Sequence, residues 1–450
     1  MTFPQQPEQI ASLRVTRLFG RFDHTLLFPA ESDISIITAP NGYGKTVLLQ
    51  MIDSLFNKQF SFFWKIDFEK VEIFLTSGKS IGILKDTADL FNEHRTDPPG
   101  AFRLTTAGFG ADGQLFSFSD ELLSRQLRSL ERNLPIDQVG PDRWHDFTLD
   151  RSLSTYEIVD RYADQLPKSV LGSVALPEWL QRALDSVDAH LVETQRLLYL
   201  EEPEERRPRG RRDRTTPPPV VERDANDLAQ HIGRLLQQYA NESQKLDQTF
   251  PKRILAFHSD SVSEETEIRA NLEELTQKQD DLMSVGLLRS TASEPIQPSD
   301  IFQQESIRRI LSIYVDDTRQ KLSIFDNTYA KIRLFKQLLD EHFSFKTVVI
   351  DPDKGISAID NDSGEGIPLS GLSSGEQHEL VLIYELLFKV REGAVILVDE
   401  PELSLHVSWQ KRFISDLKKI QELRKIKVVI ATHSPQIINN EWDLVQDLTA

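Results

Sequence analysis

A glycine-rich loop at residues 39–46 constrains the fold of this chain more than any other feature. The loop follows the short apolar run Ile34–Thr38 and precedes apolar residues at helical spacing between Val47 and Leu55. A tight turn at the N-terminus of a helix points backbone N–H groups outward and forms an anion site. The order strand, loop and helix therefore predicts an α/β domain that binds a nucleotide through its phosphates.

The residue types in this loop assign separate tasks. Glycine permits the tight turn, Lys45 is expected to reach the β and γ phosphates, and the Thr46 hydroxyl is expected to bind Mg²⁺. Ala39 stands where the usual pattern has its first glycine. The alternative is a glycine-rich turn with a chance Lys-Thr pair, which the flanking strand and helix disfavour. The predicted nucleotide-binding residues are Asn41, Gly42, Tyr43, Gly44, Lys45 and Thr46.

A second motif lies near the other end of the chain, where the apolar run Ala394–Val398 ends in Asp399 and Glu400. A continuous apolar strand is typical of a parallel sheet that is covered on both faces. Asp399 is expected to hold Mg²⁺, and Glu400 is expected to activate the attacking water as the general base. A buried strand with an acidic exit is common, so this interpretation depends on the loop at residues 39–46.

Two further motifs accompany this pair. Residues 372–377 read Leu-Ser-Ser-Gly-Glu-Gln, about 25 residues before Asp399, and a serine at a helix start forms either an anion site or only a helix cap. His433 follows the apolar run Lys427–Ile430. A histidine in this place is most often an ordinary surface residue, so its position after the acidic motif carries the functional interpretation.

Together these motifs resemble those of ATP-binding P-loop ATPases of the ABC/SMC type, including the RecF and OLD proteins. The resemblance implies that Ser373, Ser374 and Gly375 contact the γ-phosphate held by a second copy, with Ser374 standing where a glycine is usual. It also implies that His433 is a catalytic switch histidine and that residues 401–406 are a loop that crosses the dimer interface. Gln195 falls where a glutamine loop is expected, although a structural role in the run His190–Leu200 is equally compatible with the sequence.

The motifs further resemble a bacterial branch that includes ATPase subunits of anti-phage systems, such as AriA of PARIS and PtuA of Septu and some retrons. This resemblance implies a sensor or assembly subunit that hydrolyses ATP slowly or under regulation, with ATP and Mg²⁺ as cofactors. It also implies a homo-oligomer, a dimer or larger, with ATP between the copies. The chain ends soon after His433, so a separate effector such as a nuclease is the expected partner, and nucleic acid or a phage protein the expected trigger.

Two other functions stay open at this point. One is a RecF/SMC-like ATPase that acts directly on DNA in repair or maintenance, and the other is a scaffold that binds ATP and hardly turns it over. The net charge of −18 argues against a broadly basic surface, although it leaves a local basic patch open. The absence of cysteine excludes disulfides and cysteine-bound metal sites. Neither a signal peptide nor a membrane-spanning run is visible, so we expect a cytoplasmic protein without membrane contact.

The predicted fold is α/β, with an ATPase head formed from both chain ends and a mainly helical insertion between them. Helical patterns cover Ala225–Leu246, Glu264–Leu288, Ile301–Phe343 with a break near Asp326–Asn327, Glu376–Val390 and Trp409–Ile420. Six arginines within residues 206–214 form either an arm for nucleic acid or an acidic partner, or only a solvated loop. The predicted segments are an N-terminal lobe (1–85), a mixed insertion that rejoins the head near 190–200 (86–200), an Arg/Pro-rich flexible loop (201–224), a helical insertion (225–343) and a C-terminal lobe (344–450).

Overall fold

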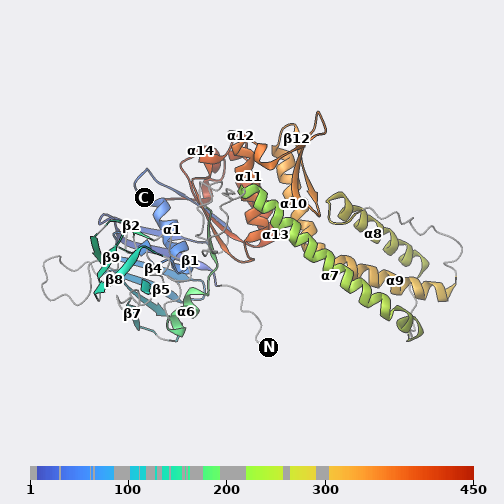
Figure 1. Ribbon diagram of the computed structural model, residues 1–450, viewed down its shortest axis with the longest axis horizontal. Helices are drawn as coiled ribbons and strands as arrows, with labels where there is room; N and C mark the ends of the chain where they lie inside the picture. The colour runs from blue at the N-terminus through green and yellow to red at the C-terminus, as the bar shows by residue number, and fades with distance from the viewer. Residues whose placement is uncertain are drawn as a thin grey trace. The chain divides into compact units, whose positions relative to one another are not determined.

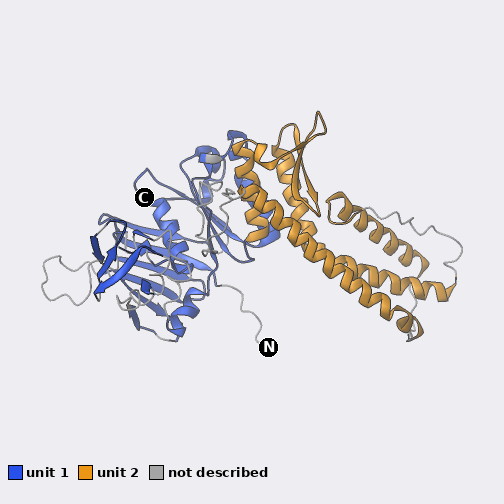
Figure 2. Ribbon diagram, in the orientation of Figure 1, with its two compact units in different colours: residues 1–195, 200–214, 390–450 blue, residues 196–199, 215–389 orange. Residues whose placement is uncertain are grey.

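The structure is a computed structural model of the 450-residue chain. It describes residues 8–29, 32–60, 62–63, 66–85, 102–110, 112–117, 127–128, 134–140, 143–149, 151–154, 158, 161–162, 176–192, 219–256, 264–289 and 304–449. Gln195 and the segment 206–214 lie outside these residues. The chain forms two compact units: unit 1 contains residues 1–195, 200–214 and 390–450, and unit 2 contains residues 196–199 and 215–389 (Figure 2).

Unit 1 contains a five-stranded parallel sheet, to which the two ends of the chain contribute four strands and the middle of the chain contributes one. Its strand order is β11-β15-β16-β3-β17. The strands are β3 (Ile34–Thr38), β11 (Ala189–Val192), β15 (Val395–Asp399), β16 (Lys427–Ala431) and β17 (Val445–Asp447). Every residue of β15 and β16 is buried, as a parallel sheet covered on both faces requires. The predicted head assembled from both chain ends is therefore confirmed.

An antiparallel sheet and helix α1 (Lys45–Phe56) complete the core of unit 1 (Figure 1). The sheet has the order β2-β1-β4-β5-β6-β7. Its strands are β1 (Ile10–Leu18), β2 (Phe22–Leu27), β4 (Lys70–Leu75), β5 (Ser80–Lys85), β6 (Phe102–Ala107) and β7 (Leu115–Ser117). Buried side chains of α1, such as Leu48 and Met51, share one apolar cluster with Leu13 of this sheet and Leu397 of the parallel sheet. This packing fixes the start of α1 against both sheets.

The rest of unit 1 consists of short elements. They are β8 (Ile136–Gly140), β9 (Arg143–Asp146), β10 (Arg151–Ser154), α6 (Glu178–Leu184), η4 (Pro401–Ser404), α12 (Val407–Gln410), α13 (Phe413–Arg424), α14 (Pro435–Ile438) and η5 (Trp442–Leu444). The prediction of one helix over Trp409–Ile420 is wrong, because α12 and α13 are separate. At the break, the Lys411 carbonyl accepts a hydrogen bond from Asn439 Nδ2 at 3.2 Å.

Unit 2 is mainly helical, with a small antiparallel sheet of order β12-β13-β14. Its elements are α7 (Val220–Ala256), α8 (Glu265–Ser284), α9 (Glu305–Ser323), α10 (Asp326–His342), β12 (Lys346–Asp351), β13 (Gly355–Asp360), β14 (Gly366–Ile367), η2 (Leu369–Gly371), α11 (Ser374–Tyr384) and the π-helical turn η3 (Glu385–Lys389). The predicted helical middle and the predicted break near Asp326 are confirmed. The prediction that a helix begins at Glu376 is wrong by two residues, because the Ser373 side chain caps the helix.

Two positions in unit 2 explain how α7 and the small sheet fit together. Gly355 at the start of β13 has a φ of +71°, and a Cβ there would lie 1.7 Å from the Ala225 carbonyl oxygen. The backbone of β13 therefore lies directly against α7.

None of the described helices is both long enough and apolar enough to cross a bilayer.

Candidate nucleotide site

Three strands of the parallel sheet place the predicted motifs at one edge. β16 lies between β15 and β3, with Asp399 paired to Ala431 and Ala431 paired to Ile37. Because the strands are parallel, the segments that follow their carboxyl ends leave the sheet side by side. Those segments carry the glycine-rich loop, the acidic pair and the His433 turn. Such an edge is where open α/β sheets bind ligands.

The glycine-rich loop depends on a left-handed backbone where it enters α1. Gly44 caps the helix with a φ of 88°, and a Cβ there would lie 2.6 Å from a methyl carbon of Leu18. The backbone angle favours glycine, and any side chain there would also displace the buried Leu18 side chain. The Gly44 carbonyl accepts the first helical hydrogen bond, from the Leu48 N–H at 2.9 Å. The N–H groups of the first turn are therefore available for an anion.

Lys45 is brought to the acidic side chains at the sheet edge. It is 5% exposed, and its Nζ donates to the Ala39 carbonyl at 3.0 Å and contacts Nε2 of His433. Burial lowers the pKa of Lys45, while the negative charges of Glu400 and Asp399 oppose that shift. A buried cation among carboxylates, at the start of a helix, is suited to hold a multiply charged phosphate.

Thr46 and Asp399 meet across 353 residues of sequence. The Thr46 hydroxyl donates to Oδ1 of Asp399 at 3.1 Å, and Asp399 is 9% exposed. Burial raises the pKa of Asp399, and the neighbouring charge of Glu400 adds to this, whereas the Thr46 hydrogen bond opposes it. A hydroxyl and a carboxylate are oxygen ligands of the kind that Mg²⁺ prefers. The two residues therefore fit a magnesium ion, whose positive charge would favour the ionised carboxylate.

Glu400 stands immediately beyond β15 in a strained backbone conformation. Its φ is 41° and its ψ is 56°, and its N–H donates to the Ala431 carbonyl at 2.8 Å. Residues other than glycine adopt this left-handed region at an energetic cost, usually where the surrounding structure enforces it. The Glu400 carboxylate forms no hydrogen bond with the described residues. It is therefore chemically able to accept a proton from a water molecule.

His433 is exposed at the same edge, and its segment is held by contacts that the sequence does not predict. Its backbone N–H donates to Oε1 of Glu402 at 2.8 Å. The Gln410 amide then connects this segment to the turn that follows Glu400, through Ser434 Oγ and the Glu402 carbonyl. No motif spacing predicts these contacts, because they join side chains to groups that are distant in the sequence.

A second missed feature is an aromatic pocket beside the glycine-rich loop. Phe19 and Arg21 from the turn between β1 and β2, and Phe22 at the start of β2, line it together with Asn41–Tyr43. The rings of Phe22 and Tyr43 are 4.9 Å apart between centroids and tilted by 31°. His24 Nε2 lies 2.9 Å from the Tyr43 carbonyl oxygen, and burial lowers the pKa of His24. The pocket offers flat apolar surfaces next to the predicted phosphate site.

The serine motif at residues 372–377 belongs to unit 2, where Ser373 caps α11 through a reciprocal capping box. The Ser373 hydroxyl accepts from the Glu376 N–H at 3.3 Å, and the Ser373 N–H donates to Glu376 Oε2 at 2.7 Å. Lys346 Nζ donates to the same carboxylate at 2.8 Å. Ser374 and Gly375 form the first turn. The cap interpretation is therefore confirmed, and the phosphate contact of these residues stays a prediction.

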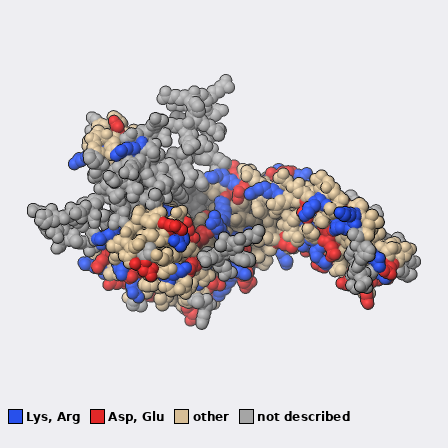
Figure 3. Space-filling model, turned by 90° about the horizontal axis from the view of Figure 1, so that it is seen from below, with Lys and Arg blue, Asp and Glu red and all other residues tan. Residues whose placement is uncertain are grey.

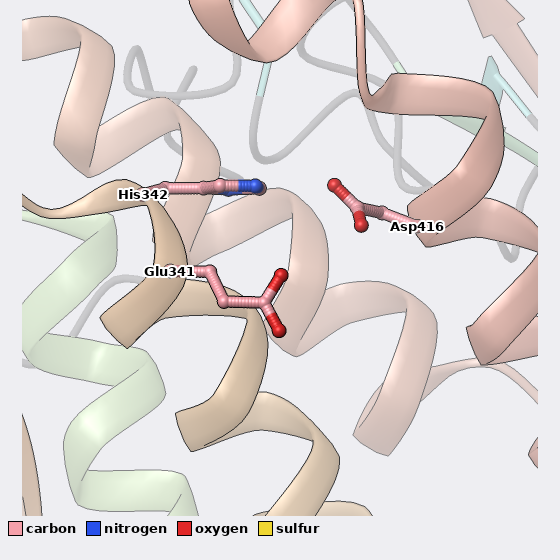
Figure 4. Close-up of side chains that lie close together, drawn as sticks. All are labelled: Glu341, His342 and Asp416. Atoms are coloured by element: carbon pink, nitrogen blue, oxygen red, sulfur yellow. The ribbon is translucent and has the colours of Figure 1, made fainter.

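Figure 4 draws three further polar side chains, of which two belong to unit 2 and one belongs to unit 1. Glu341 and His342 end α10 in unit 2, and the His342 imidazole contacts the Glu379 carboxylate of α11. Asp416 lies in α13 of unit 1, where Lys419 Nζ is 3.3 Å from its Oδ1. Within unit 2 the His342 contact joins α10 to α11, and within unit 1 Asp416 pairs with Lys419 one turn along the same helix.

Comparison with known proteins gives one family match across most of the chain. The family model described as "AAA domain, putative AbiEii toxin, Type IV TA system" matches residues 36–439. Among solved structures, the Smc head domain from Pyrococcus furiosus bound to a ScpA domain is 11% identical, with a TM-score of 0.31, covering 96% of this chain and 92% of that one. The SMC head domain from Thermotoga maritima is 12% identical, with a TM-score of 0.34, covering 98% and 94%.

Proposed function

Because this chain belongs to the AbiEii-type AAA-domain family, we propose that it binds and hydrolyses ATP and controls a separate effector protein in a bacterial anti-phage system. The observation that carries the proposal is the meeting of Lys45, Thr46 and Asp399 at the carboxyl edge of one parallel sheet. Asp399 is 353 residues away from Thr46 in the sequence, yet the fold places its carboxylate beside the Thr46 hydroxyl. A buried lysine, a hydroxyl and a carboxylate in one place are the groups that a phosphate with its magnesium ion requires.

The chemistry of hydrolysis follows from the side chains at this edge. Lys45 and the first-turn N–H groups of α1 bind the phosphates. Thr46 and Asp399 would hold Mg²⁺, which would neutralise charge on the phosphate oxygens. Glu400 accepts a proton from the attacking water. The adenine base lies in the pocket of Phe19, Arg21 and Phe22, beside Tyr43, where a flat ring can stack. We assign the γ-phosphate contact to His433 as well, because its Nε2 contacts Lys45 Nζ.

A homo-oligomer with ATP between copies fits two features. Ser373 and Gly375 form a helix N-terminus that can receive a phosphate. Leu403 and Val407 are 68% and 54% exposed in the segment that follows Glu400, which provides apolar surface for a partner. Both features support a γ-phosphate held by two copies of the chain.

A RecF/SMC-like role directly on DNA is the alternative function. On the face drawn in Figure 3, acidic and basic side chains of the described residues are intermixed. With a net charge of −18, such a surface favours a protein partner over the phosphate backbone of DNA. The sensor role is therefore the better supported of the two.

Two substitutions test the proposed function. Lys45→Ala removes the phosphate-binding cation and should abolish ATP binding. Glu400→Gln should leave ATP binding intact and stop hydrolysis, because the amide cannot take the proton. Binding is measured by calorimetry and turnover by phosphate release. Normal hydrolysis by the Glu400→Gln chain would show that another group is the base.

The defence role needs a second measurement. The chain is expressed together with its neighbouring genes in a bacterial host, and plaque counts are compared for wild type and Lys45→Ala. Protection that requires Lys45, together with co-purification of a nuclease or toxin, is the expected result. Retention of a purified chain on duplex DNA with a strong salt dependence, and no co-purifying effector, would instead favour the DNA-repair alternative.

A further inference from the structure

The segment after the acidic pair and the His433 turn are joined by a side-chain network that no motif describes. We define this brace as Glu402, Gln410 and Ser434. Glu402 belongs to η4, directly after Glu400 and Pro401. Gln410 ends α12, and Ser434 precedes α14. The three side chains thus connect three separate elements of unit 1.

Gln410 holds both sides of the brace. Its Nε2 donates to the carbonyls of Glu402 at 3.1 Å and Leu405 at 3.0 Å, and its Oε1 lies 3.1 Å from Ser434 Oγ. Gln410 is buried, so these bonds are shielded from water. The turn 401–405 and the segment 432–434 are therefore held in one fixed relation.

Glu402 makes the contact that matters for chemistry. Its Oε1 accepts the His433 backbone N–H at 2.8 Å, while its Oε2 is buried without a hydrogen-bond partner among the described residues. Among the described residues, the Glu402 carboxylate thus makes its hydrogen bond to His433. The next polar contact of His433 is Lys45 Nζ, at the predicted phosphate position.

From this geometry we infer that Glu402 is a positioning residue for ATP hydrolysis, which fixes where the His433 imidazole stands relative to Lys45 and Glu400. The inference rests on the proposed ATPase function. A carboxylate that only satisfied a backbone N–H would affect stability alone. A positioning residue instead affects the chemical step more than ground-state binding, because small displacements of reacting groups lower rates steeply.

The test compares Glu402→Ala with Glu402→Gln, whose amide oxygen can still accept the His433 N–H. Glu402→Ala should lower kcat about 100-fold and leave the affinity for ATP unchanged. Glu402→Gln should restore kcat close to wild type. Glu422→Ala, an exposed change on α13 of the same unit, is the matched control and should behave as wild type. A Glu402→Gln chain as slow as Glu402→Ala overturns the inference.

A double-mutant cycle asks whether Glu402 acts through His433. In a His433→Ala background, Glu402→Ala should have no further effect on kcat, because the imidazole that it positions is gone. Equal slowing in both backgrounds overturns the inference. Hydrogen exchange of the His433 amide, faster in Glu402→Ala and protected in Glu402→Gln, tests the contact whether or not ATP is turned over. A wild-type chain without turnover contradicts the proposed function, and unchanged amide exchange contradicts the brace.

Discussion

At the residue scale, Glu376 shows how neighbours set the charge of a helix cap. Burial disfavours its ionised form, but hydrogen bonds from Lys346 and from the Ser373 N–H and hydroxyl outweigh burial and lower the pKa of Glu376. A carboxyl group whose pKa is lower in the folded chain contributes stability above its unfolded pKa. That contribution is lost as the pH falls through the folded pKa.

Glu376→Gln should therefore lower the stability of unit 2 relative to wild type at pH 7, and lower it less at acid pH. The amide keeps the shape of the cap but loses the charge that attracts Lys346, at a cost of about 1 to 2 kcal/mol. The difference between variant and wild type should shrink below about pH 4. Urea denaturation at pH 7 and pH 3.5 measures it, with the exposed Glu365→Gln as the control. An equal difference at both pH values would contradict the assigned ion pair.

The motif residues could be predicted from sequence, whereas residues that act by contact could not. Lys45, Thr46 and Asp399 each stand in a spacing that phosphate chemistry requires, and the structure brings them together. Phe22 and Glu402 carry no such spacing. Their positions depend on which segments the sheet places side by side, and one chain without that topology gives no sign of it.

At the element scale, Gly355 determines how closely α7 and β13 can approach. Its φ of +71° is equal to that of Gly364, yet a Cβ at Gly364 would meet nothing within 4 Å. Comparing Gly355 with Gly364 therefore separates the free-energy cost of the left-handed backbone angle from the cost of the close approach to α7. The helical pattern of residues 225–246 predicts the central part of α7, but no sequence pattern contains information on the distance between α7 and β13.

Gly355→Ala should therefore destabilise unit 2 far more than Gly364→Ala. The control pays only for the left-handed backbone, about 1 kcal/mol, whereas Gly355→Ala must also displace α7, which adds about 1 to 3 kcal/mol. Chemical denaturation of the two variants, monitored by circular dichroism, measures the difference. Similar loss of stability in both would show that α7 can move away from β13 without cost.

The predicted ends of elements are wrong where side-chain hydrogen bonds, rather than apolar spacing, determine where a helix ends. The apolar spacing of residues 409–420 is helical throughout, yet α12 ends at Gln410 and α13 begins at Phe413. Near this break, the Gln410 side chain donates to the Glu402 carbonyl and the Asn439 side chain donates to the Lys411 carbonyl. Likewise, the strands between residues 102 and 154 are short and pair locally, so they leave little periodic signal. A long run with a single period predicts a helix but not its ends, as for α7, which extends beyond the predicted residues 225–246 on both sides.

At the scale of the whole molecule, the proposed sharing of ATP between copies leads to a complementation experiment. Lys45→Ala disables the phosphate loop of one copy, and Ser373→Arg blocks the α11 N-terminus of another. A mixed dimer should contain one site with both defects and one site with neither. Mixing the two inactive chains should therefore restore turnover, with a maximum near equal amounts. Mixtures that stay inactive at every ratio would contradict a site shared between copies.

The order of strands in the parallel sheet also matters while the chain is being made. β3 bonds to β16 on one side and β17 on the other, and 388 residues, from 39 to 426, separate β3 from β16. At about 5 to 20 residues per second, a ribosome takes roughly 20 to 80 s to cover that distance. Throughout that interval the strand that carries the glycine-rich loop has no neighbour in its sheet. The nascent chain therefore cannot close this edge, and ATP should not protect it from protease, until β16 has left the ribosome.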